Sequence, residues 1–219
     1  MRVEIWSDVV CPWCYIGRRR FEKALDQFEY RDQVEVIWRS FQLDPNTPRE
    51  YPGSIFDMLM QMHGLSRERS EAMHAQLTEL AAKDGLDYRF DRVRPANSWD
   101  AHRLLHLAAH HGVQSVMKER LQRAYFTDGL SISDPGTLVQ LAVEIGLDAE
   151  ETRRMLEDPQ AYADAVRSDI RKARVLGISG VPFFVMDEKY GVSGAQATEL
   201  FLEALERAWA DAHPVEQSV

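Results

Sequence analysis

Alternating apolar and polar residues predict a short strand at the start of the chain, followed by a helix. Residues 2–6 read RVEIW, in which Val3 and Ile5 alternate with the other three, as in a strand of period two. The helix begins at Pro12, because proline suits the first helical position, where its missing N–H breaks no hydrogen bond. Its apolar stripe consists of Ile16, Phe21, Leu25 and Phe28.

A second strand is predicted over residues 33–43, QVEVIWRSFQL, with Val34, Val36 and Trp38 on one face. Strand, helix and second strand together have the length of a βαβ crossover. Residues 44–53, DPNTPREYPG, contain three prolines and mark a boundary.

Residues 54–176 carry an almost wholly helical pattern. Its segments end where a glycine precedes an apolar residue, since glycine adopts the left-handed conformation just past a helix end. Helix starts are predicted at Ser66 and at Asp134, and Asp148 is expected to form a capping box with Glu151. The expected endings lie at Gly64, Gly85, Gly112, Gly129, Gly146 and Gly177.

The C-terminal part returns to strands. Residues 181–194, VPFFVMDEKYGVSG, predict a hairpin with strands at 183–186 and 190–192. Residues 197–212 predict a last helix. The order is therefore β-α-β, a helical block, then α-β-β-α, and the block must dock between two halves of an α/β core. On the inner side of the last helix we expect Leu200, Phe201, Leu205 and Ala208.

Composition narrows the function classes. The chain has 219 residues and a net charge of −9, which argues against nucleic-acid partners and anionic membranes. No apolar run approaches the roughly 18 residues that span a bilayer, and the N-terminus lacks the apolar stretch of a secretion signal. We expect a cytoplasmic protein, in which a lone cysteine pair is usually catalytic, redox-sensing or metal-binding.

The chain's two cysteines, Cys11 and Cys14, lie within the segment DVVCPWCYIG. If Cys11 caps the helix that begins at Pro12, its sulfur faces unpaired backbone N–H groups and the positive end of the helix dipole. Both stabilise a thiolate, so we predict a depressed pKa for Cys11. Cys14 lies one turn inward and can close a disulfide. The side chains of Trp13 and Pro12 limit which substrates can approach the two sulfur atoms.

A zinc site is the alternative for this pair. Two thiolates supply half of a tetrahedral site, so histidines would have to complete it. His106 and His110 lie one helical turn apart, but nothing in the sequence places them near Cys11. We therefore assign no metal ligand, and a metal-binding or redox-sensing protein remains the non-enzymatic alternative.

Two segments carry a family resemblance. SDVVCPWCYIGRRRFEKAL, residues 7–25, and GISGVPFFVMDEKYGVSGAQ, residues 177–196, resemble the DsbA-like thioredoxin-fold oxidoreductases. More closely, they look like the cytosolic FrnE-type branch, which is related to glutathione-dependent 2-hydroxychromene-2-carboxylate isomerases and kappa-class glutathione transferases. The resemblance covers nearly the whole chain. It implies an α/β thioredoxin-like fold over residues 1–50 and 170–219, with a large all-helical insertion at 51–169.

The resemblance also implies roles around the cysteines. Cys11 matches the exposed, nucleophilic cysteine and Cys14 the resolving one, while Pro182 matches a cis-proline that faces them. A cis bond at Val181–Pro182 would leave the backbone groups of Val181 free to pair with an extended substrate.

Further substrate contacts are implied for Pro12, Trp13, Ser193, Gly194 and Asn97. Ser193 and Gly194 precede the last helix, where their N–H groups could bind a carboxylate, as in the glutathione site of the related isomerases. A plain turn before the helix is the alternative. Asn97, or Ser98 beside it, is also a natural helix N-cap.

Two departures from the related proteins affect the function. The isomerases and transferases carry a serine where this chain has Cys11, so dithiol exchange is favoured here. Many thioredoxins carry a buried acid where this chain has Ile5; Asp8 is nearer and polar, and it serves either proton transfer or a turn.

We therefore predict a thiol–disulfide oxidoreductase that acts on protein thiols and disulfides or on a small thiol. It needs no cofactor, with glutathione as the candidate co-substrate. A glutathione-dependent isomerase or transferase of a small aromatic compound is the alternative. The direction of exchange, the substrate and a homodimeric state are left open by the sequence.

Overall fold

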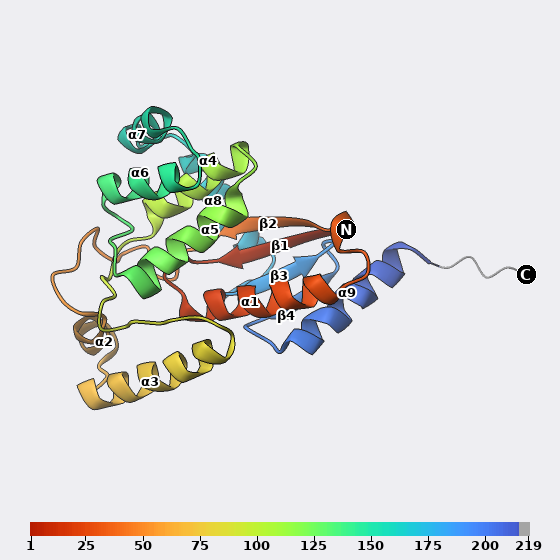
Figure 1. Cartoon of the computed structure of the whole chain (residues 1–219), viewed down its shortest axis with the longest axis horizontal. Coiled ribbons are helices and arrows are strands. Elements are labelled where there is room, and N and C mark those ends of the chain that lie inside the picture. Colours follow the sequence, from red (N-terminus) through yellow and green to blue (C-terminus); the bar gives the residue numbers. More distant parts are fainter. Residues whose placement is uncertain (215–219) are drawn as a thin grey trace, which may run out of the picture.

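Within residues 1–214, which the computed structural model describes, four strands form one mixed sheet in the order β2-β1-β3-β4 (Figure 1). Strand β1 pairs in parallel with β2 and antiparallel with β3, and β3 pairs antiparallel with β4. The predicted βαβ unit and C-terminal hairpin are therefore both present. The strands are β1 (Arg2–Ser7), β2 (Glu35–Ser40), β3 (Phe183–Met186) and β4 (Tyr190–Ser193).

The helices fall into a group beside the sheet and a group that extends away from it (Figure 1). Their bounds are α1 (Pro12–Gln27), α2 (Ile55–His63), α3 (Arg67–Lys83), α4 (Trp99–His110), α5 (Gln114–Arg123), α6 (Pro135–Glu144), α7 (Ala149–Glu157), α8 (Ala163–Val175) and α9 (Thr198–Ala212). A short 3-10 helix, η1 (Arg31–Gln33), precedes β2, and a π-helix, η2 (Ala124–Asp128), extends α5. The chain is thus the predicted α/β thioredoxin-like fold with a helical insertion.

Helices cover both faces of the sheet. On one face, Phe21 of α1 and Phe201 of α9 pack against Phe184 of β3. On the other face, Trp6 of β1 packs against α8 and donates its indole N–H to Asp169 O at 3.0 Å. The expected half-polar character of β1 is therefore wrong, because an inner strand that is covered on both faces has no exposed side.

A buried carboxylate on β1 shows how a charge is accommodated in this strand. Glu4 is 1% exposed, and its two oxygens contact Arg39 of β2 at 2.5 Å and Lys172 of α8 at 2.6 Å. A buried charge needs paired and hydrogen-bonded partners. The ion pairs therefore fix the register of β2 and the position of α8 against β1.

Most of the predicted helix boundaries are confirmed, and three details are corrected. Every expected terminal glycine has a positive φ. Asp148 caps α7, but the expected capping box with Glu151 is replaced by a contact of the Glu151 carboxylate with His111 at 2.9 Å. A capping box is found instead at the start of α2, between Ser54 and Asp57. The second strand ends at Ser40, since the chain turns away there. Leu200 is exposed rather than inward-facing.

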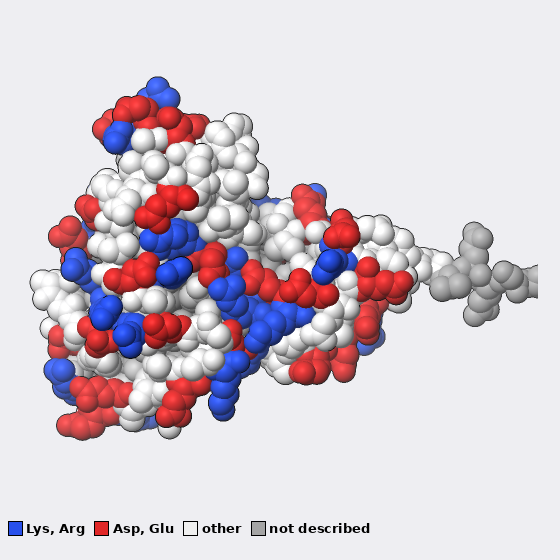
Figure 2. Space-filling view, in the orientation of Figure 1, with Lys and Arg blue, Asp and Glu red and all other residues white. Residues whose placement is uncertain are grey.

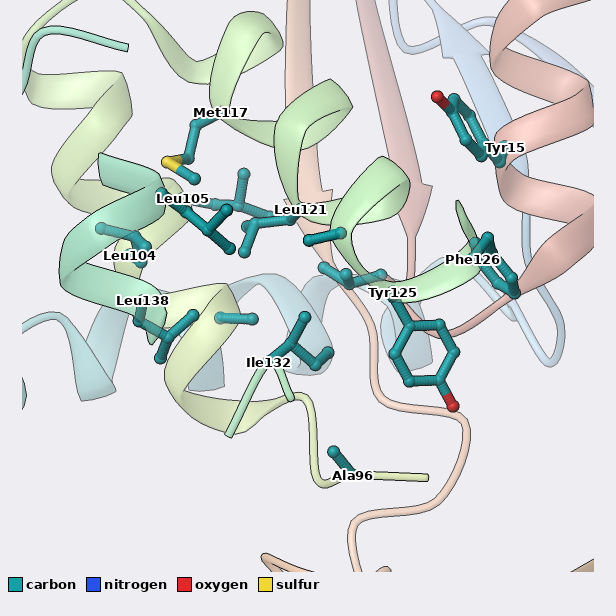
Figure 3. Packing of buried hydrophobic residues seen from close by; sticks show 14 of the residues in the cluster. Tyr15, Ala96, Leu104, Leu105, Met117, Leu121, Tyr125, Phe126, Ile132 and Leu138 are labelled. Atoms are coloured by element: carbon teal, nitrogen blue, oxygen red, sulfur yellow. The ribbon is translucent and has the colours of Figure 1, made fainter. Parts of the chain in front are cut away.

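The helical insertion has an apolar core of its own that continues onto α1. Phe126 of η2 approaches Tyr15 of α1, with ring centroids 6.3 Å apart. The core therefore fixes α1 against the insertion, while the domain division at residues 51 and 169 remains a prediction. Figure 3 shows the packing around Leu104, Leu105, Met117, Leu121, Ile132 and Leu138.

Charged side chains of both signs are interspersed over the face shown in Figure 2, with basic side chains gathered near α1. Arg20 and Lys23 of α1 bond the two carboxylate oxygens of Asp84, just after α3, at 2.8 and 3.1 Å. These cations thus join two helices. No helix in the described part of the chain is long and apolar enough to cross a bilayer.

Candidate active site

The loop between β1 and α1 is held by the buried side chain of Asp8. Its carboxylate accepts hydrogen bonds from Leu43 N at 2.8 Å and from Val10 N at 3.5 Å. His102 Nε2 of α4 lies 3.2 Å from the same carboxylate. Burial acts to raise the pKa of Asp8, but the hydrogen bond from His102 and the Leu43 amide hold it below its usual value. Asp8 therefore fixes the loop that delivers Cys11.

Cys11 is the N-cap of α1, as the sequence predicts, with the extended backbone angles of φ −89° and ψ 113°. Pro12 occupies the first helical position, and the Cys14 amide donates to Cys11 O at 3.1 Å. The Tyr88 hydroxyl donates to Pro12 O at 2.6 Å. The first turn is therefore fixed both by its own hydrogen bonds and by the insertion.

Both thiols are free and buried, and their surroundings correct the pKa prediction. Cys14 is 1% exposed and Cys11 3%, so the exposed nucleophile that the resemblance implies is instead buried in the structure. The hydrogen bond with Cys14, burial and the charge of Cys14 raise the pKa of Cys11 well above its ordinary value, against a lowering by the Cys14 amide. The helix terminus expected to stabilise a thiolate is thus outweighed by the neighbouring thiol and by desolvation.

The segment before β3 completes the site from the other end of the chain. The Cys11 sulfur lies 3.6 Å from Val181 O, to which its S–H donates. The Val181–Pro182 peptide bond is cis. Gly194 N donates to Pro182 O at 2.9 Å, which ties this segment to the end of β4. The structure therefore brings together the cysteine pair, Val181 and Pro182.

The remaining predicted contacts have other partners. The Gly194 amide is already engaged with Pro182 and is not free for a carboxylate, while a role for Ser193 remains a prediction. Asn97 donates to Pro45 O at 3.2 Å and Thr47 O at 2.8 Å. Its amide therefore anchors the loop after β2. The sequence alone does not indicate that these two carbonyl groups lie next to Asn97.

A large apolar cavity opens beside the two residues that separate the cysteines in the chain. Its volume is about 900 Å³, and Pro12 and Trp13 form part of its wall. Trp13 is 45% exposed at this wall. Most of the lining comes from α2, α3 and η2, including Met58, Met62, Met73, Leu77, Tyr125 and Phe126. Sequence reasoning missed α2 and α3 as parts of the site, because their apolar residues fit an ordinary helical stripe.

The histidines weighed for a zinc site are engaged elsewhere. His106 Nε2 lies 3.1 Å from Asp169 Oδ2 and 3.2 Å from Ser40 Oγ, and the His110 ring contacts that of His111. Among the residues that the structure describes, no group of three or more His, Cys, Asp or Glu is arranged to hold a metal ion.

Comparison with known proteins agrees with this geometry. Residues 2–206 match the model of the DSBA-like thioredoxin domain. A protein described as a probable DsbA oxidoreductase of Streptomyces coelicolor is 48% identical; the alignment covers 100% of this chain and 94% of that one, with a TM-score of 0.93. YwbO of Bacillus subtilis is 27% identical over 94% of this chain and 96% of its own.

More distant structures share the fold. The cytosolic disulfide reductase DsbM of Pseudomonas aeruginosa, solved with GSH, is 19% identical over 97% of both chains, with a TM-score of 0.62. A 2-hydroxychromene-2-carboxylate isomerase is 12% identical over 99% of this chain and 100% of that one, with a TM-score of 0.69.

Proposed function

The chain belongs to the DSBA-like thioredoxin domain family, and on this premise we propose that it is a thiol–disulfide oxidoreductase working through Cys11 and Cys14. One observation carries the proposal. Two free thiols occupy the first turn of α1, and the first of them contacts Val181 beside Pro182. A thiol pair on one helical turn can form and release a disulfide by exchange.

The exchange proceeds in two steps. The Cys11 thiolate attacks a substrate disulfide, so a Cys11–substrate bond forms and one substrate sulfur leaves as a thiolate. The Cys14 thiolate then attacks Cys11 Sγ, which releases the second substrate thiolate and leaves a Cys11–Cys14 disulfide. Two electrons pass from the protein to the substrate. A small thiol such as glutathione restores the dithiol by two exchanges in the opposite sense.

The surroundings of Cys11 favour the reductive direction. A dithiol–disulfide pair is strongly oxidising when its reduced form is stabilised. Here the hydrogen bond with Cys14 and burial raise the pKa of Cys11, so its thiolate lacks that stabilisation. The protein would then donate electrons to substrate disulfides, which fits a thiol-rich cytoplasm, and no membrane or nucleic-acid partner enters this cycle.

The cavity supports an apolar substrate. Its wall includes Pro12 and Trp13, which lie between the two cysteines in the chain, and continues over α2 and α3. Methionine side chains adapt to differently shaped apolar groups. We therefore place apolar side chains flanking the substrate disulfide in this cavity, and the disulfide itself at Cys11.

The test is reduction of insulin disulfides by the purified protein with glutathione as electron donor. Cys11→Ser should abolish turnover, and Cys14→Ser should stop the reaction at a mixed disulfide on Cys11 that mass spectrometry identifies. Ser168→Ala, at an exposed position on α8 away from the cysteines, serves as the control. Full turnover by both cysteine variants would exclude the proposal.

The same cavity favours a second candidate, because it also has room for a small aromatic compound. A glutathione-dependent isomerase or transferase needs a single activated thiol, supplied by glutathione. Its activity on an electrophilic aromatic compound would survive Cys14→Ser, whereas disulfide reduction would not. Measuring both reactions on the same variant separates the two functions.

A further inference from the structure

One buried histidine forms part of the wall of the large cavity that α2 and α3 line. His74 lies on α3 and is 6% exposed. Its Nδ1 lies 2.7 Å from Ser70 O, one turn earlier on the same helix. A carbonyl oxygen accepts and never donates, so Nδ1 carries a proton and donates it to Ser70 O. The other ring nitrogen, Nε2, is therefore the atom left for a further partner.

The side chains that flank His74 do not bond this nitrogen. Phe56 of α2 and Phe90, after α3, meet the imidazole ring edge to face, with ring centroids 5.2 and 4.3 Å away. Among the residues that the structure describes, the hydrogen-bond partners of the ring are Ser70 atoms, and all are reached from Nδ1. Burial lowers the pKa of His74, so the ring is neutral at pH 7 and Nε2 holds a lone pair. Nε2 is therefore a hydrogen-bond acceptor that lacks a donor.

The free nitrogen of His74 is reached from the cavity. Nε2 lies at the end of the imidazole ring away from Cβ, whereas Nδ1 is turned back toward the backbone of α3. Although it has no partner among the described residues, Nε2 is not one of the side-chain atoms that are sealed from solvent. The open space that His74 lines is the cavity. A buried acceptor without a donor is unfavourable, and a ligand that donates to Nε2 would remove this cost.

The rest of the wall fits an uncharged aromatic ligand. The cavity volume of about 900 Å³ lies in the range of small-molecule sites, which combine an apolar lining with a few polar groups. Trp13, Phe90 and Phe126 contribute aromatic rings to the wall, and methionines of α2 and α3 contribute thioethers. Both groups make favourable contacts with aromatic rings. The charged lining residues Glu79 and Lys83 are exposed, so they lie toward solvent and leave the interior uncharged.

We propose that this cavity binds a small aromatic molecule with a phenolic hydroxyl, whose O–H donates to His74 Nε2 while its rings lie against the aromatic and methionine side chains. A neutral phenol supplies the missing donor without bringing a charge into an apolar cavity. A free molecule is favoured over a tyrosine side chain of a protein substrate, because the cavity holds much more than one side chain. The inference deepens the proposed function by naming the chemistry of the cavity's ligand, but the binding itself requires neither thiol.

The experiment measures binding of three probes to the purified, full-length protein by equilibrium dialysis at pH 7. The first is 2-naphthol, and the second is 2-methoxynaphthalene, in which a methyl group replaces the hydroxyl proton. We expect the Kd of 2-naphthol to be about 10-fold lower, because the ether leaves Nε2 without a donor. The third probe, N-acetyltyrosinamide, presents a phenol on a peptide-like unit and should bind more weakly than 2-naphthol.

One substitution and a matched control assign the preference to His74. His74→Phe keeps a ring between Phe56 and Phe90 but removes both nitrogens, so it should raise the Kd of 2-naphthol to that of the ether. His110→Phe makes the same change at an exposed position on α4, outside the cavity wall, and should retain the wild-type preference. Where His74→Phe fails to fold, nitrogen-15 NMR of the wild type replaces it: the Nε2 resonance of His74 should move upfield with 2-naphthol and stay in place with the ether.

The outcomes separate this inference from the proposed function. Equal affinity of the wild type for the two naphthalenes, or a preference that His74→Phe retains, would overturn the phenol site, even in a protein that reduces insulin. N-acetyltyrosinamide bound as tightly as 2-naphthol would assign the cavity to tyrosine side chains and overturn the small-molecule ligand. A wild type that prefers 2-naphthol as expected but does not reduce insulin would overturn the oxidoreductase alone.

Discussion

Gly17 on α1 lies against the ring of Pro182, so closely that a Cβ on residue 17 would come within 2.9 Å of Pro182 Cγ. Glycine in the middle of a helix costs about 1 kcal/mol relative to alanine. Its presence here lets the helix that carries both cysteines approach the segment that contacts Cys11. The close approach of α1 to the segment around Pro182 therefore depends on the absence of a side chain at residue 17.

Replacing Gly17 by alanine should reduce activity much more than stability. The new methyl group must push Pro182 or α1 aside, which typically costs 1–3 kcal/mol, while the gain in helix propensity offsets about 1 kcal/mol. We expect the rate of insulin reduction to fall about 10-fold, since small displacements at a reacting centre are costly.

Thermal unfolding and turnover measured on the same sample check this prediction. Gly136→Ala on α6 is the control, because its new Cβ would meet only the capping carboxylate of Asp134, at 3.3 Å. Equal losses of activity in the two variants would contradict the close approach described for Gly17.

The ionisation of Cys11 should depend on its neighbour. Because the hydrogen bond with Cys14 is the largest cause that raises the pKa of Cys11, Cys14→Ala should lower that pKa. Thiolates react with iodoacetamide and thiols do not, so the rate of Cys11 alkylation should rise at a lower pH in Cys14→Ala than in Cys14→Ser, which keeps a hydrogen-bonding group. Identical pH profiles for the two variants would show that Cys14 does not control the ionisation.

Substrate binding in the cavity can be tested with two methionines on one helix. Met62 lines the cavity, whereas Met60 on α2 does not, although the two are similarly exposed, at 43% and 40%. Met62→Glu should raise the KM for insulin several-fold and leave reduction of a small, polar disulfide unchanged. Met60→Glu should change neither. A rise in KM shared by both variants would argue against binding at this wall.

Stability should fall in mild acid through His102. Burial lowers the pKa of His102, so below about pH 6.5 the unfolded chain binds a proton that the native protein resists. The free energy of unfolding should therefore decrease as the pH falls from 6.5 to 5.5. Asp8, whose pKa is lowered, keeps its stabilising contribution until the pH falls below about 4.

Urea unfolding at pH 7 and pH 5.5 measures this loss. His102→Gln should reduce stability at pH 7 and flatten the dependence on pH in this window. His111→Gln, at an exposed position paired with Glu151, should retain the wild-type slope. A wild-type stability that does not change between the two pH values would refute the assignment of a buried, neutral His102.

The sequence predicted those parts of the fold that have local causes. Gly64 and its counterparts end helices because of their own backbone, and Pro12 starts α1 for the same reason. The cysteine pair was found because it is a contiguous motif. The depressed pKa predicted for Cys11 was wrong, since a helix terminus can be recognised locally while burial and the orientation of Cys14 cannot.

The features that the sequence did not predict depend on contacts between segments that are distant along the chain. The burial of Lys118 of α5 against Ser7 could not be predicted, because in sequence Lys118 is one of several basic residues on an amphipathic helix. The resemblance implied a substrate contact for Asn97, whereas the carbonyls to which its amide donates lie 50 or more residues away in the chain. The alternation in β1 does not reveal that Trp6 is buried, because the residues of α8 that cover it come more than 160 positions later in the chain.

Cys11 and Val181 are separated by 170 positions along the chain. A ribosome that adds about 5–20 residues per second takes roughly 10–30 s to travel between them. During that interval β1 can already pair with β2, but the backbone groups on its other edge remain unpaired until β3 is synthesised. That edge can meanwhile pair with a strand of another polypeptide. Translation that stalls before codon 183 would therefore yield a polypeptide with both thiols, an unfinished sheet and a tendency to aggregate.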